Sequence, residues 1–167
     1  MTNFTTTFET ITQSKIFKDF IEKNPQAELV AGFFILDFLS NDTKTSLDYK
    51  IDSKIFTFSI SLQDEITMRE DKLIDKPGLP ILTKIKPEVK IDLDEIPSLA
   101  EKSAIENNIT SKFQKIIAVL QNHEEQEIWN LTCMLDGLII LNILISSNTG
   151  KIIKFERKSM MDFIKKK

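Results

Sequence analysis

The sequence predicts an α+β fold of two tandem units, each a helix packed on an antiparallel sheet of three to four strands. Three observations lead to this prediction. Each half of the chain has an amphipathic helical stretch, each continues with short apolar–polar alternations, and a proline-rich connection separates the two. We therefore assign an N-terminal unit to residues 1–75, a linker to 76–88 and a C-terminal unit to 89–167.

The N-terminal unit is predicted to begin with a helix at 14–24, because apolar side chains recur there on one helical face. Ser14 is a suitable N-cap, and Asn24-Pro25 ends the helix. Alternating apolar residues predict strands further along the chain, at 28–38, 46–52 and 54–62. Residues 65–74 fit either a fourth strand or the start of the linker.

The C-terminal unit is predicted to begin with a helix that starts near Glu95, with Asp92 or Asp94 as its cap. Small and apolar residues form the inner face of this helix, namely Leu99, Ala100, Ala104 and Ile105. Residues 111–121 fit a strand or a short helix, and we favour the strand.

A hairpin follows, in which Asp136-Gly137 is the two-residue turn between strands at 127–135 and 138–146. In the first of these strands, Trp129 and Cys133 alternate with polar residues and are expected to face the core. A last strand is expected at 151–156, and the residues after it fit a short helix.

The C-terminal end of the chain is strongly basic, although the whole chain has a net charge of −3. We therefore take its cations as candidate partner-binding residues: Lys154, Arg157, Lys158, Lys165 and Lys166. Such a tail suits an anionic partner or a membrane surface, or else it packs on the sheet as a terminal helix. The acidic remainder of the chain argues against a nucleic-acid partner.

The residues usually needed for catalysis are scarce. Cys133 and His123 are the only Cys and His, and we expect Cys133 to be a buried structural residue and His123 a solvated one. We therefore predict that the protein is not an enzyme and has no catalytic residues, cofactor or metal site. The start of the chain lacks a signal-peptide pattern, and the apolar run 138–145 is too short for a transmembrane segment, so a cytoplasmic location is expected.

Residues 87–156 resemble a PepSY-type module. The stretch VKIDLDEIPSLAEK corresponds to the strand and helix of that module, and SSNTGKI at 146–152 resembles its D-x-x-T-G-x-(I/V) ending without the usual acidic residue. The resemblance implies a cystatin-like helix-on-sheet fold, with the N-terminal half as a more divergent copy. It also implies non-catalytic binding or regulation, often of peptidases.

We accordingly predict a non-catalytic protein-binding or regulatory module, related to peptidases through this resemblance. It would act through a sheet face, a strand edge or the basic tail, and a homodimer is one such arrangement. The alternative is a carrier of a small apolar ligand, with a pocket between helix and sheet. Nine of the 12 phenylalanines lie in residues 1–58, which would place that pocket in the N-terminal unit.

Overall fold

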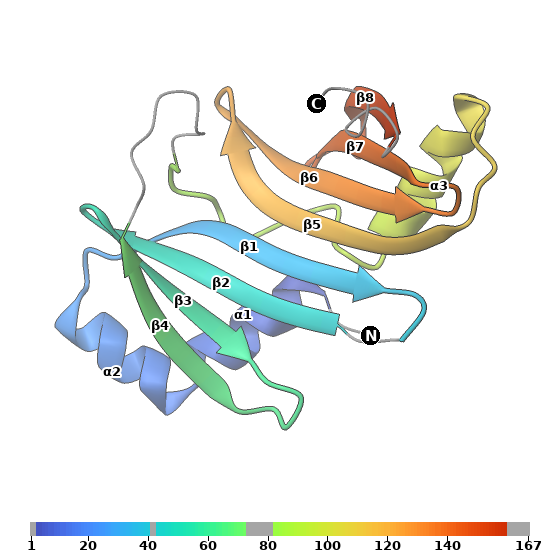
Figure 1. Ribbon diagram of the computed structural model, residues 1–167. Coiled ribbons are helices and arrows are strands. Elements are labelled where there is room, and N and C mark those ends of the chain that lie inside the picture. Colours follow the sequence, from blue (N-terminus) through green and yellow to red (C-terminus); the bar gives the residue numbers. More distant parts are fainter. Residues whose placement is uncertain (1–2, 41–42, 73–81, 160–167) are drawn as a thin grey trace.

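The computed structural model describes residues 3–40, 43–72 and 82–159. Within them the chain forms three helices and one eight-stranded antiparallel sheet, which confirms the predicted α+β class (Figure 1). The helices are α1 (Phe4–Thr12), α2 (Lys15–Lys23) and α3 (Ile96–Glu106). The strands are β1 (Glu28–Asp37), β2 (Thr43–Ile51), β3 (Lys54–Ile60), β4 (Ile66–Lys72), β5 (Phe113–His123), β6 (Gln126–Leu135), β7 (Ile139–Ser146) and β8 (Ile152–Ser159).

Both halves of the chain contribute to this one sheet. Its strand order is β4-β3-β2-β1-β5-β6-β7-β8, so β1 and β5 form the joint and β4 and β8 the two edges. At the joint, Phe33 pairs with Val119 and Ile35 with Ile117. An antiparallel ladder therefore holds the two halves together. Residues 76–81 of the predicted linker lie outside the described residues, and 82–88 run beside the sheet, where the backbone N–H of Ile85 donates a hydrogen bond to the carbonyl of Leu29.

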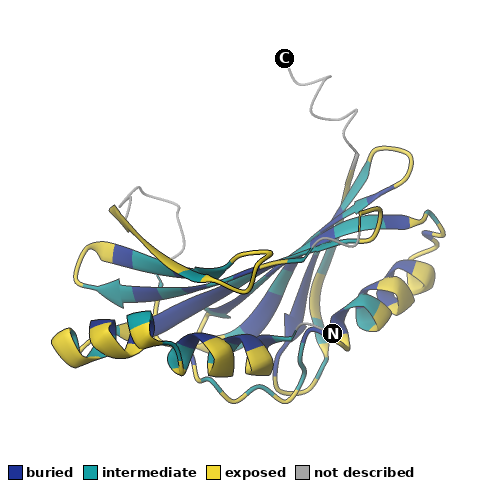
Figure 2. Cartoon of the chain, turned by 90° about the horizontal axis from the view of Figure 1, so that it is seen from below, coloured by how far each residue is buried: buried dark blue, intermediate teal, exposed yellow. Residues whose placement is uncertain are grey.

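The helices all lie on one side of the sheet, and the two ends of the sheet bend away from them (Figure 2). The side chains between helices and sheet form the core, which includes the fully buried Phe4, Phe34, Phe58 and Trp129. Burial of each such side chain contributes about 1.5–3 kcal/mol. We call the opposite side of the sheet, on which no described helix lies, the open face.

Helix α2 agrees with its prediction. The hydroxyl of Ser14 accepts a hydrogen bond from the backbone N–H of Phe17 at 3.3 Å, and the helix ends at Lys23 with Asn24 as its C-cap. The ring of Phe17 packs on those of Tyr49 and Phe58, with centroids 5.1 and 5.2 Å apart. The apolar stripe seen in the sequence therefore becomes an aromatic contact with β2 and β3.

Helix α1 was not predicted, and it changes the role of Asp92. The carboxylate of Asp92 accepts hydrogen bonds from the backbone N–H groups of Phe4 and Thr5, at the start of α1. The N-cap of α3 is Glu95, whose side chain makes no capping hydrogen bond. The prediction that Asp92 or Asp94 caps α3 is therefore wrong. Asp92 instead supplements the N-cap Asn3 of α1, a helix from the other half of the chain.

Two further details differ from the predictions. The β6–β7 loop has three residues rather than two, because Leu135 pairs with Ile139 and the chain turns through Gly137 and Leu138 at φ +82° and +61°. In α3, Ile105 is 64% exposed rather than on the inner face.

The helix expected after the last strand lies largely beyond Ser159, outside the described residues. No described helix is long and apolar enough to cross a membrane.

Candidate functional site

The open face has an apolar centre at the joint between the two halves. Side chains alternate between the two faces along each strand, and Phe34 is buried on the helix side. Its neighbours Phe33 and Ile35 therefore lie on the open face, as do their partners on β5, Val119 and Ile117. All four side chains are half-buried within the described residues, although no described helix lies on them. We call this set of four residues the apolar centre.

Polar side chains border the apolar centre on both neighbouring strands. On β2, Ser46 pairs with Phe33 and Lys44 with Ile35. On β6, Asn130 pairs with Val119 and Thr132 with Ile117. An apolar middle with a polar rim is the usual anatomy of a protein–protein interface.

Cations outnumber anions among the charged residues of the open face. By strand register, the cations are Lys44, Lys50, Arg69, Lys115, Lys154 and Lys158, and the anions are Glu28, Asp37, Asp48, Asp71 and Glu156. Lys115 lies 3.9 Å from the carboxylate of Asp37, and Arg69 lies 2.9 Å from that of Asp71. Lys44 forms no ion pair with any described residue. The charges of the open face therefore nearly balance, and Lys44 is a cation without an ion-pair partner among the described residues.

Two acids of the open face have pKa values that are shifted in opposite directions. Burial raises the pKa of Asp48, and the hydroxyl of Thr57, which donates a hydrogen bond of 2.6 Å, opposes this. The pKa of Asp37 is lowered, chiefly because its carboxylate accepts hydrogen bonds from the backbone N–H groups of Leu39 and Ser40. Asp37 therefore remains ionised beside the apolar centre.

The structure separates the basic residues that the sequence grouped together. Lys154 and Lys158 lie on the open face of β8 on either side of Glu156, at 3.3 and 3.6 Å from its carboxylate. A hydrogen bond from Lys154 and the charges of both lysines lower the pKa of Glu156. Arg157 points to the opposite face by alternation. Lys165 and Lys166 lie outside the described residues, so their predicted role stays a prediction.

A hollow of about 320 Å³ lies beside the apolar centre at one end of β2 and β3. Phe33, Lys44, Ser46, Ser59 and Leu62 are among its lining residues. Leu62 is 85% exposed, and Phe33 belongs to both the hollow and the apolar centre. Composition did not reveal this hollow, because it depends on the register that pairs Ser46 with both Phe33 and Ser59.

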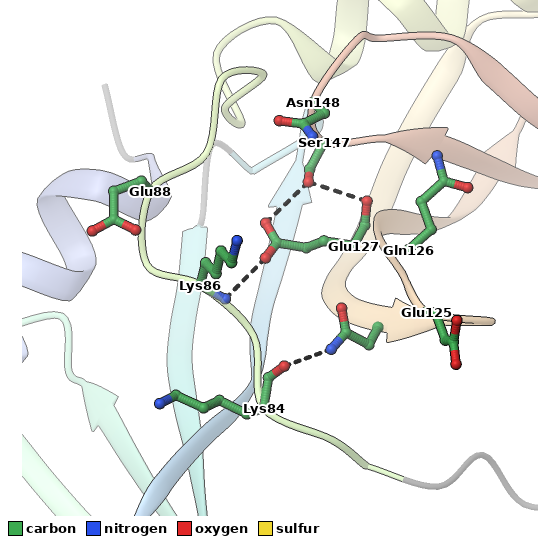
Figure 3. Close-up of a pocket in the computed structure, with 9 residues that line it drawn as sticks. Lys84, Lys86, Glu88, Glu125, Gln126, Glu127, Ser147 and Asn148 are labelled. Carbon is green, nitrogen blue, oxygen red and sulfur yellow. Dashed lines mark hydrogen bonds between the residues drawn. The ribbon is translucent and has the colours of Figure 1, made fainter.

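A second, polar cleft of about 370 Å³ lies between the segment that leads to α3 and the β5–β6 hairpin (Figure 3). There the carboxylate of Glu127 accepts hydrogen bonds of 3.0 Å from the backbone N–H of Lys86 and from the hydroxyl of Ser147. The side-chain amide of Asn122 donates to the carbonyl of Lys84. These bonds fasten the connecting segment to the sheet, and burial raises the pKa of Glu127.

The candidate catalytic residues do not come together. Cys133 is fully buried in the core, as predicted, and burial raises the pKa of its thiol to about 12. His123 is exposed at the end of β5, 3.9 Å from the carboxylate of Glu124. Among the described residues, no group of three or more His, Cys, Asp or Glu side chains is placed to hold a metal ion.

Comparisons with known proteins support the fold alone. No family model and no curated protein match the chain. The fold is similar to that of a crystal structure described as a putative lipoprotein from Clostridium difficile 630, with a TM-score of 0.59. That likeness covers 86% of this chain and 90% of the other, at 14% sequence identity. At such low identity the likeness indicates a shared architecture and gives no information about activity.

Proposed function

We propose that this protein is a non-catalytic protein-binding module that recognises its partner with the open face of the sheet. The observation that carries the proposal is the half-buried apolar centre of Phe33, Ile35, Ile117 and Val119, bordered by polar and cationic side chains. Covering these side chains would remove further apolar surface from water, at about 25 cal/mol per Å². The polar rim would then set the orientation of the partner.

The sheet edges are less suited to this role. The outer strand β4 carries four consecutive charged residues at 69–72, and the outer strand β8 carries Lys154, Glu156 and Lys158 on one face. Charged side chains, lysine above all, are a common means of preventing edge-to-edge pairing. A homodimer through either edge would bring these charged side chains close to those of a second copy, so we favour the face.

We propose that the two halves are tandem copies, because their strands are arranged symmetrically about the β1–β5 joint and helices precede each set of four strands. The resemblance of residues 87–156 to PepSY-type modules makes a peptidase one class of partner to test. We propose that the protein is cytoplasmic. The structural likeness to a lipoprotein makes attachment to a membrane the alternative, and cell fractionation would distinguish the two locations.

A photo-crosslinking amino acid tests the use of the open face. We would place p-benzoylphenylalanine at Ile117, and at the exposed Lys102 of α3 as a control on the helix side. Irradiation in cells should give a discrete crosslinked protein from position 117 and none from 102. Val119→Glu in the same chain should remove that product, while Thr67→Glu, which adds the same charge on β4 away from the apolar centre, should keep it. Equal products from positions 117 and 102 would contradict the proposal.

The second candidate function is the binding of a small apolar ligand, and the hollow beside Phe33 is the observation that favours it. On the helix side, the rings of Phe17, Phe20 and Phe58 pack against one another at 5.1–6.3 Å. A ligand would therefore bind more readily in the hollow than among these phenylalanines. Native mass spectrometry of gently purified protein tests this candidate, since a retained ligand adds mass and a bare chain counts against it.

A further inference from the structure

We propose that the hollow beside the apolar centre receives an aromatic side chain of the partner with a polar group on its ring, an indole or a phenol, next to a partner carboxylate. This inference rests on the proposed function, because the hollow adjoins the apolar centre through Phe33. It names the chemistry of the residue that the partner would insert there. Such buried aromatic anchors commonly supply most of the affinity of an interface.

The size and lining of the hollow favour an aromatic group. Its volume of about 320 Å³ is at the lower end of the range for ligand pockets, which suits one large side chain rather than an extended ligand. Phe33 offers a ring for an edge-to-face contact, and the side chain of Leu62 is almost fully exposed beside it. An inserted ring would cover both side chains.

The polar groups of the hollow favour an indole or phenol over a plain aliphatic side chain. Ser46 and Ser59 face each other across β2 and β3. Neither hydroxyl has a hydrogen-bond partner among the described residues. Either one can accept a bond from an indole N–H or exchange one with a phenol hydroxyl. Both rings combine a large apolar surface with one polar atom, as this lining requires.

The charge of the hollow favours a carboxylate beside the ring. Lys44 lines it and has no ion-pair partner in the described part of the chain. An aspartate or glutamate next to the aromatic residue of the partner would therefore pair with Lys44.

Titration of the full chain with small probes tests the inference. Indole-3-acetate, indole and sodium acetate would each be added to ¹⁵N-labelled protein and followed by amide chemical shifts. We expect indole-3-acetate to give saturable shifts centred on Phe33, Ser46, Ser59 and Leu62, with a Kd in the millimolar range. Indole should bind at the same place about two- to fivefold more weakly, the usual range for one exposed ion pair. Acetate alone should produce no saturable shift.

Substitutions separate the two parts of the inference. Lys44→Gln should make indole and indole-3-acetate bind equally, whereas Lys115→Gln, which removes an open-face lysine away from the hollow, should preserve their difference. Ser59→Leu should fill the hollow and abolish binding of both probes while the remaining amide shifts stay in place. No saturable shift with either aromatic probe, shifts centred elsewhere, or equal affinities in the unmodified chain would overturn the inference. If neither aromatic probe causes saturable shifts but position 117 still gives a crosslinked partner, the inference about the hollow is overturned and the proposed function stands.

Discussion

Asp92 joins the N-terminal helix to the second half of the chain, and its removal should measurably destabilise the fold. Its carboxylate accepts hydrogen bonds from the Phe4 N–H at 2.6 Å, the Thr5 N–H at 3.1 Å and the Thr5 hydroxyl at 2.8 Å. Hydrogen bonds to a charged group contribute about 1.5–3 kcal/mol each when well made, and loss of a cap costs about 0.5–2 kcal/mol. The site is partly exposed and Asn3 keeps its own capping box, so we expect Asp92→Ala to lower the free energy of unfolding by about 2–3 kcal/mol.

Urea denaturation of the full chain measures this loss, and thermal unfolding should show a decrease in Tm of about 5–10 °C. Asp94→Ala is the matched control, because Asp94 is exposed and has no side-chain hydrogen bond to any described residue. We expect it to change stability by less than about 0.5 kcal/mol. A loss below about 0.5 kcal/mol for Asp92→Ala, or an equal loss for both variants, would refute the reasoning that Asp92 stabilises the start of α1.

Three further substitutions have definite expected outcomes. Thr7→Val should leave the free energy of unfolding unchanged or raise it by up to about 1 kcal/mol in urea denaturation, because the buried Thr7 hydroxyl has no hydrogen-bond partner among the described residues. Trp129→Phe should lower it by about 2 kcal/mol, since it removes the 2.8 Å hydrogen bond from the indole N–H to the Ile91 carbonyl and leaves a void. Burial raises the pKa of Glu127, so the protonated form is favoured in the folded state, and the stability of this protein relative to Glu127→Gln should increase as the pH falls from 7 to 4. A flat difference between those two chains over that range would contradict the last expectation.

The strands and α2 could be predicted because their signals are local. Alternation along β6 placed Trp129 and Cys133 in the core, and the structure confirms both as fully buried. Helix α1 was missed because the threonine-rich FTTTFETIT has weak helix propensity. Its start does have a local signal, the capping box of Asn3 and Thr6, whereas the contact from Asp92 is distant in sequence and leaves no spacing pattern.

The candidate site was less accessible to sequence reasoning than the fold. The basic residues 154–158 looked like one cluster, but strand alternation sends Lys154 and Lys158 to one face and Arg157 to the other. No sequence motif indicated the apolar centre, because the sequences of β1 and β5 are each typical of an ordinary buried strand. Only the registry of β1 against β5 shows that outward-facing apolar residues from both strands meet.

That registry also explains why the open face needs both halves of the chain. Phe33 and Ile35 come from the first half, Ile117 and Val119 from the second, and the β1–β5 ladder sets them side by side. A binding surface at such a joint is complete only when the two halves pair, whatever the origin of the halves. Each half alone would expose a long central strand, β1 or β5, as an unprotected and largely apolar edge, whereas the strands that do form the edges are charged. The apolar middle and charged edges of the sheet are therefore consistent with the proposed binding at the open face and argue against pairing through the edges.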